Sequence, residues 1–168
     1  RLTKQKGYDV LIYAIKQVVE KVPEIVLVIG GEGEDELILL KLIRDLALDN
    51  HVKLLGIIQD TDEYFKHCHV YINSSRWEGL PMTLLEAMSY SKPIIATNVG
   101  GNADVVRNDK TGILVESEDI DALARAILTL VNDKTLREKI GSNAHELFMN
   151  EYSIEKHCEK LAKYYIGL

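Results

Sequence analysis

Two glutamates stand eight positions apart in the segment SSRWEGLPMTLLEAM (74–88). Glu78 belongs to a loop that contains a glycine and a proline, and Glu86 follows in an apolar run with helical spacing. Paired carboxylates are the acid and base of glycoside hydrolysis, so one hypothesis makes this pair a glycosidase centre. The simplest structural interpretation is an exposed helix glutamate and a loop charge.

The helix start between the two glutamates favours a different chemistry. Its first turn offers unpaired N–H groups from about Met82 and Thr83, and such amides favour a phosphate group. Glu86, one turn further, can accept two hydrogen bonds from a vicinal diol such as that of ribose. Glu78 then faces what lies beyond the phosphates. A glycosidase leaves this phosphate-suited helix start unexplained.

A basic loop opens the chain, RLTKQKG (1–7), in which Arg1 and Lys6 bracket the entry to a helix. Such a loop at a helix N-terminus can hold an anion, although basic loop residues are often simply solvated. The formal net charge is −6, from 20 basic and 26 acidic residues. Because a general nucleic-acid binder is basic, nucleic acid is not expected as a partner.

Two glycine loops also follow predicted strands. In TNVGGNADVV (97–106), Gly100 and Gly101 permit close backbone approach to a ligand or a positive φ, and a plain turn is the alternative. GGEGEDE (30–36) carries Glu36 where a dinucleotide-binding loop has its third glycine. Its acidic residues would also repel a pyrophosphate, so a tight turn is favoured over an NAD site.

No metal site is predicted. The HCH motif (67–69) has no second cluster near it in sequence, which favours surface or packing histidines. Cys68 and Cys158 are far apart and fit no metal-ligand spacing, so two free thiols in a reducing compartment are expected. No run of about 18 apolar residues is present, so no membrane span is expected.

Strands and helices must alternate to position these loops. Apolar periodicity predicts helices over 8–22, 34–48, 60–68, 82–90, 119–132, 134–150 and 153–166, and strands over 25–31, 52–56, 70–73, 93–97 and 112–115. Asp60, Asp119 and Ser153 are the expected N-caps. The alternation predicts an α/β fold with a parallel sheet and right-handed crossovers.

In such sheets ligands bind beyond the carboxyl ends of the strands. The important loops therefore start near Gly30, Gly56, Ser74, Asn98 and Arg1. A strand directly before Arg1 would complete the pattern, and the chain is expected to be a piece of a longer protein.

Taken in order along the chain, the motifs resemble the C-terminal, donor-binding half of a retaining GT-B glycosyltransferase of family 4, the glycosyl transferases of group 1. The resemblance spans essentially all 168 residues. The matching elements are an Arg…Lys-Gly element at Arg1, Lys6 and Gly7, an E-x7-E motif at Glu78 and Glu86, and a GGxPE loop at 100–104. That loop reads GGNAD, with Ala103 and Asp104 where Pro and Glu are typical, and the shorter acid reaches less far. The implied fold is a Rossmann-like parallel sheet with helices on both faces.

The resemblance implies a role for each matched residue. Arg1 and Lys6 would clamp the nucleotide diphosphate and stabilise it as it leaves. Glu86 would hold the ribose diol, and Glu78 would contact the transferred sugar. The remaining donor-binding groups would be the backbone of Gly79 and Leu80 at the sugar, the amides of Met82 and Thr83 at the phosphates, Ile58 at the nucleobase, and Gly100 and Gly101. No metal or other cofactor is implied.

As a whole, the resemblance implies a retaining hexosyltransferase acting in bacterial polysaccharide, capsule or lipopolysaccharide synthesis. The EGLPMTLLEAM segment favours a UDP-sugar as donor. A non-catalytic nucleotide-binding or interaction module of the same fold is the alternative. A cytoplasmic protein is expected, with the full-length enzyme peripheral at the membrane face.

The domain division follows from the same resemblance. Residues 1–152 would bind the donor, and the helix within 153–168 would pack toward an acceptor-binding N-terminal domain outside this chain. Without that domain, its apolar face (Ile154, Leu161, Tyr165) would be exposed or used in a dimer. Residues 1–168 alone are expected to bind donor weakly and to transfer no sugar efficiently.

Overall fold

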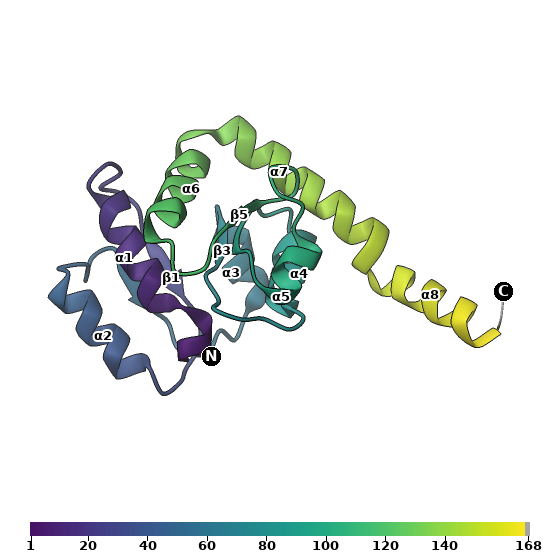
Figure 1. The fold of residues 1–168 in the computed structure, drawn as a ribbon, viewed down its shortest axis with the longest axis horizontal. Coiled ribbons are helices and arrows are strands. Elements are labelled where there is room, and N and C mark those ends of the chain that lie inside the picture. Colours follow the sequence, from purple (N-terminus) through teal and green to yellow (C-terminus); the bar gives the residue numbers. More distant parts are fainter. Residues whose placement is uncertain (167–168) are drawn as a thin grey trace.

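The computed structural model describes residues 1–166 and shows alternating strands and helices, as the sequence predicts (Figure 1). Along the chain these are η1 (Lys4–Lys6), α1 (Tyr8–Val19), β1 (Leu27–Ile29), α2 (Glu36–Asp45), β2 (Val52–Leu54), α3 (Thr61–His67), β3 (Tyr71–Asn73), α4 (Met82–Ser89), β4 (Ile94–Thr97), α5 (Gly100–Val105), β5 (Ile113–Val115), α6 (Ile120–Asn132), α7 (Lys134–Leu147), η2 (Phe148–Tyr152) and α8 (Ile154–Ile166).

All strand pairs are parallel, which confirms the predicted α/β class. β1 pairs with β2, and β4 lies between β3 and β5. The hydrogen-bonded strands therefore form two separate groups, β1-β2 and β3-β4-β5. Parallel neighbours require crossover connections, and the helices between the strands supply them.

Apolar helices cover both faces of the strands. Side chains of β4 alternate between two clusters: Ile95 packs with α1 and α6, whereas Ile94 and Ala96 pack with α4 and α7. β4 is consequently buried at every position. This is the continuous apolar pattern that a strand covered on both faces requires.

Helix ends follow local side-chain chemistry. The predicted caps are confirmed: Asp60 accepts from the Glu63 amide at 2.9 Å and Asp119 from the Ala122 amide at 2.8 Å. Ser153 Oγ accepts from the Lys156 amide at 3.4 Å. Each cap satisfies a backbone donor that the first helical turn cannot pair internally.

Several predicted boundaries differ from the structure. The segment 97–106, expected as a loop, turns into the short helix α5 after Val99. The helix expected over 134–150 ends at Leu147 and continues as the π-helix η2. Strand β1 is shorter than the apolar run 25–31, because a three-residue partner strand limits the hydrogen-bonded length.

Helix α8 extends away from the body of the molecule beyond η2 (Figure 1). Its apolar residues Ile154 and Leu161 are exposed, as are Tyr164 and Tyr165. The structure thus presents the apolar face that the sequence analysis expected, while its packing partner stays a prediction. Among residues 1–166, no helix is long and apolar enough to cross a membrane.

Candidate functional site

Loops from three separate parts of the chain meet at the carboxyl ends of the strands. The loop after β3 binds the η1 loop through Ser74 Oγ, which donates to Lys6 O at 2.9 Å. The start of α5 binds the same β3 loop, because the Gly101 amide donates to Glu78 O at 3.2 Å. Gly100 has φ +40°, and a Cβ added there would lie 2.1 Å from Glu78 O. Glycine is therefore required where α5 meets the Glu78 loop.

The Glu78 carboxylate is held at both oxygens. Lys6 Nζ donates to Oε1 at 2.6 Å, and Gln5 Nε2 donates to Oε2 at 3.1 Å. The same Gln5 nitrogen donates to Trp77 O at 2.9 Å. The Glu78 side chain is only 7% exposed. Charge-assisted hydrogen bonds on both oxygens fix the orientation of a nearly buried carboxylate.

Arg76 ties the Glu78 loop to helix α1. Its Nη1 and Nη2 donate to the two carboxylate oxygens of Asp9 at 2.9 and 2.8 Å, and Nη1 also donates to Lys4 O at 2.7 Å. Its Nε pairs with Glu118 at 2.5 Å. These hydrogen bonds to Asp9 raise the pKa of the Arg76 guanidinium above its ordinary value. The bidentate geometry gives the loop a fixed position.

The pKa of Asp9 responds in the opposite sense. Burial alone would raise the pKa of this carboxyl, but the hydrogen bonds and charge of Arg76 outweigh burial. The pKa of Asp9 therefore lies below its ordinary value.

Beside Lys6 lies a cavity of about 250 Å³. Arg1 and Lys6 line it from the N-terminal loop, Thr83 and Glu86 from α4, and Ile58 from the loop after β2. Thr83 Oγ1 accepts a hydrogen bond from the Tyr71 hydroxyl at 2.7 Å. The cavity therefore combines two cationic side chains with a carboxylate and a helix start.

The start of α4 leaves backbone donors free. Pro81 provides no side-chain cap, and the first amides that bond back to Pro81 O are those of Leu84 and Leu85. Within residues 1–166, the amides of Met82 and Thr83 have no acceptor. Ser75 Oγ, which also lines the cavity, is buried without a partner. Unpaired amides at a helix N-terminus and an unpartnered hydroxyl suit an anion with several oxygens.

A family model described as glycosyl transferases group 1 matches residues 1–147. The chain belongs to this family. A curated relative from Escherichia coli, named UDP-Gal:alpha-D-GlcNAc-diphosphoundecaprenol alpha-1,3-galactosyltransferase, is 32% identical over 175 residues. That match covers all of this chain and 44% of the relative. Other curated relatives are named for capsular polysaccharide and lipopolysaccharide core biosynthesis.

Solved structures share the fold of this chain. Anabaena Alr3699/HepE in complex with UDP superposes with a TM-score of 0.93 at 26% identity, covering 100% of this chain and 47% of that one. The C-terminal domain of a group 1 family protein from Francisella tularensis superposes at 0.83 with 28% identity, covering 92% and 83%. The chain thus spans less than half of its curated relatives and corresponds to a C-terminal domain, as predicted.

In this group 1 domain, five of the predicted donor-binding residues surround one cavity: Arg1, Lys6, Ile58, Thr83 and Glu86. Glu78 joins them through its ion pair with Lys6. The structure therefore brings together residues that are up to 85 positions apart in the sequence, because the loops that carry them leave the strands at one edge.

The other predicted residues lie outside that cavity. Leu80 and Met82 are exposed, and a Cβ added at Gly79 would meet no atom within 4 Å. Gly100 and Gly101 approach the backbone of Glu78 and Gly79 closely. The close approach expected at these two glycines is thus made to the chain's own loop. Their contact with a donor stays a prediction.

Sequence reasoning missed Gln5, Ser75 and Arg76. Gln5 holds the second oxygen of Glu78, and Arg76 anchors the loop that carries it. Their proximity to predicted residues could have indicated Gln5 and Arg76, because Gln5 precedes Lys6 and Arg76 lies two residues before Glu78. Hydrophobic periodicity does not indicate them, because their side chains contact residues more than 60 positions away in the sequence.

The thiols and histidines form no cluster. Cys68 and Cys158 are both free. His67 Nδ1 lies 2.9 Å from Glu63 O on its own helix. Over residues 1–166, no group of three or more His, Cys, Asp or Glu side chains is placed to hold a metal ion.

Proposed function

We propose that this chain is the donor-binding domain of a retaining hexosyltransferase whose donor is a nucleotide-diphosphate sugar, with UDP as the preferred nucleotide. The observation that carries the proposal is the single cavity lined by Arg1, Lys6, Glu86 and the uncapped start of α4. The names of the Escherichia coli relative and of the HepE complex, both of which contain UDP, support the choice of nucleotide.

The cavity offers a group for each part of a nucleotide diphosphate. The amides of Met82 and Thr83, with Arg1 and Lys6, would bind the phosphates. Glu86, one turn along α4, would accept both hydroxyl protons of the ribose diol. Ile58 would lie against the base. Glu78, with the backbone of Gly79 and Leu80, would contact the hydroxyls of the transferred sugar.

Transfer breaks the bond between the sugar carbon and the diphosphate oxygen, and a bond to the acceptor oxygen forms. Negative charge grows on the departing diphosphate, where Arg1, Lys6 and the start of α4 are already in place. Lys6 also stays bonded to Glu78, so the charge that binds phosphate and the carboxylate that positions sugar are coupled. Retention follows if the acceptor attacks the face that the diphosphate leaves, with its proton passing to the leaving oxygen.

The acceptor would be bound elsewhere in the whole protein. We propose an N-terminal acceptor-binding domain toward which α8 packs its exposed apolar face. Acceptors in polysaccharide, capsule or lipopolysaccharide synthesis are supported by the names of the curated relatives. Such acceptors fit a cytoplasmic enzyme that is peripheral to the membrane. We also propose that the enzyme needs no metal cofactor.

Calorimetric titration of the protein with UDP, GDP and ADP tests the donor site. UDP should bind, and Glu86→Ala should weaken it about 10- to 100-fold, because a hydrogen bond to a charged group contributes about 1.5–3 kcal/mol. Arg1→Ala should weaken it similarly. Glu138→Ala, on an exposed face of α7, is the matched control and should bind as the wild type does. Absence of nucleotide binding at millimolar concentration refutes the assignment.

Turnover separates the enzyme from a non-catalytic module of the same fold. The whole protein should release UDP from a UDP-sugar when acceptor is supplied, and added EDTA should leave the rate unchanged. Nucleotide binding without release of UDP from the UDP-sugar would favour the non-catalytic module.

A further inference from the structure

Tyr71 of strand β3 lines the candidate donor cavity, although nothing in the sequence pattern assigned it to the site. Its hydroxyl donates to Thr83 Oγ1 at 2.7 Å, across 12 positions of the chain. Thr83 lines the same cavity, as does Glu86. Thr83 and Glu86 are three positions apart on α4, so their side chains lie on one face of that helix. Tyr71 therefore contacts the wall of the cavity one turn before Glu86.

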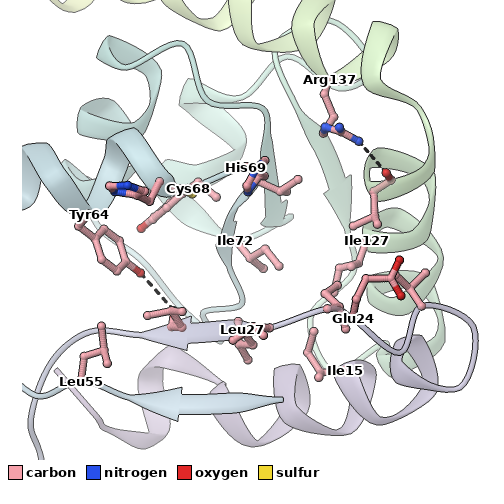
Figure 2. A pocket seen from close by; sticks show the side chains of 18 of the residues that line it. Ile15, Glu24, Leu27, Leu55, Tyr64, Cys68, His69, Ile72, Ile127 and Arg137 are labelled. Atoms are coloured by element: carbon pink, nitrogen blue, oxygen red, sulfur yellow. Dashed lines mark hydrogen bonds between the residues drawn. The ribbon is translucent and has the colours of Figure 1, made fainter. Parts of the chain in front are cut away.

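Neighbouring aromatic rings hold the Tyr71 ring in place. Phe65 of α3 packs against Tyr71 with ring centroids 6.0 Å apart, and Tyr64 packs edge-on against Phe65 at 5.6 Å. The Tyr64 hydroxyl donates to Val28 O at 3.2 Å (Figure 2). Each of these two tyrosine hydroxyls thus has its own partner, and the partner of Tyr71 is Thr83.

The direction of this hydrogen bond decides what the Thr83 hydroxyl can do. Burial raises the pKa of the Tyr71 hydroxyl above its ordinary value of 10.0, so the phenol keeps its proton at neutral pH. A hydroxyl has one proton and two lone pairs, so Thr83 can accept from Tyr71 and still donate its own proton. Within residues 1–166, that proton has no acceptor.

The other polar groups of the cavity indicate what would accept the proton. Arg1 and Lys6 line the cavity and carry side-chain donors only. Ser75 Oγ also lines it, and this hydroxyl is fully buried without a partner in residues 1–166. A group with several oxygens and a negative charge, such as a phosphate, would accept hydrogen bonds from all of these donors.

We propose that Tyr71 is a positioning residue for phosphate binding and that it acts through the Thr83 hydroxyl. By donating to Thr83 Oγ1, Tyr71 leaves the single proton of that hydroxyl to a phosphate oxygen in the cavity. The hydroxyl thereby adds a side-chain donor to the backbone amides at the start of α4. Because Glu86 lies one turn away, the phosphate that Thr83 contacts is the one attached to the ribose. This inference rests on the proposed function, which supplies the nucleotide diphosphate.

Calorimetric titration of the whole protein with UDP tests the Thr83 hydroxyl. Thr83→Val replaces the hydroxyl by a methyl group of similar size and should weaken UDP binding about 10-fold, because a hydrogen bond to a charged group is lost. Thr83→Ser keeps the hydroxyl and should bind UDP within about twofold of the wild type. Uridine, which lacks phosphate, should bind to Thr83→Val within about twofold of the wild type when measured by displacement of UDP. Binding of UDP by Thr83→Val within about twofold of the wild type overturns the proposal.

Tyr71→Phe tests the positioning role, because it removes only the hydroxyl that reaches Thr83. UDP binding should weaken about three- to fivefold, since the released Thr83 hydroxyl can take three staggered orientations. In a Thr83→Val protein, Tyr71→Phe should have no further effect on UDP binding. Effects of the two variants that multiply overturn the proposal, because Tyr71 then acts independently of Thr83. Unchanged or tighter UDP binding by Tyr71→Phe also overturns it, because Thr83 then donates to Tyr71.

Tyr90→Phe is the matched control for packing. Tyr90 stacks on the same Phe65 ring with centroids 5.1 Å apart, but its hydroxyl contacts Asp62. This variant should bind UDP within about twofold of the wild type, and a loss equal to that of Tyr71→Phe overturns the proposal. A wild-type protein that binds no UDP refutes the proposed function as well. A wild-type protein that binds UDP no better than Thr83→Val refutes this inference alone.

Discussion

Replacing Lys6 by methionine should destabilise the domain through Glu78. The Glu78 side chain is 7% exposed and its Lys6 partner 25% exposed. Methionine keeps the length and apolar stem of the lysine but removes the donor at 2.6 Å. Among residues 1–166, Gln5 at 3.1 Å is then the one donor left to the Glu78 carboxylate, which water scarcely reaches.

The magnitude follows from this partial burial. Breaking a fully buried ion pair by removing one partner costs about 3–5 kcal/mol. Since Lys6 retains some contact with water and Gln5 still donates, we expect a cost of about 2–3 kcal/mol. For a domain of this size that corresponds to a fall in melting temperature of about 5–10 °C.

Urea and thermal unfolding of Lys6→Met, Glu78→Gln and the double variant measure this cost and the coupling between the two residues. Lys41→Met is the matched control, because Lys41 pairs with Asp45 at 3.1 Å with both side chains more than half exposed. Its cost should be below about 0.5 kcal/mol. A coupling energy for Lys6 and Glu78 below about 0.5 kcal/mol, the bound expected for the exposed pair, refutes the reasoning.

Two further predictions concern the loops around this pair. Gly100→Ala should cost about 2 kcal/mol or more in unfolding free energy, because φ at Gly100 is +40° and the new Cβ would lie 2.1 Å from Glu78 O. Gly79→Ala, whose new Cβ would meet nothing within 4 Å, should cost less than about 1 kcal/mol. Equal effects of the two variants in urea unfolding would contradict the contact between Gly100 and Glu78. The pKa of Asp9 is lower in the folded chain than its ordinary value of 3.8, so the unfolded chain binds this proton first as the pH falls. The stability that Asp9 contributes is therefore complete above pH 3.8 and is lost as the pH falls through the lower folded pKa. The Asp9→Asn variant should lose less stability over that interval than the wild type. Identical profiles of stability against pH for the two proteins would exclude the Arg76 contact as the cause.

The order of elements and the convergence of several candidate site residues could be predicted from the sequence. Helical apolar spacing and short continuous apolar runs locate most helices and strands, and the loops that leave one edge of a parallel sheet must converge. This convergence brought Arg1, Lys6, Thr83 and Glu86 to one cavity, as predicted. The caps at Asp60, Asp119 and Ser153 are local and were equally predictable.

Long-range side-chain contacts could not be predicted. Gln5 bonds to Glu78 across 73 positions, and no local pattern encodes such a partner. α5 was missed because Gly100 and Gly101 have poor helix propensity, whereas packing of Asn102 and Val105 against the strands stabilises the turn.

The candidate donor site shares a wall with a second cavity, of about 770 Å³, that lies between β1 and β3 (Figure 2). Tyr64, Tyr71 and Ile72 line both the large cavity and the smaller one that contains Lys6 and Glu86. A substitution at Tyr71 or Ile72 should therefore change the cavity that contains Lys6 and Glu86 as well as the larger one.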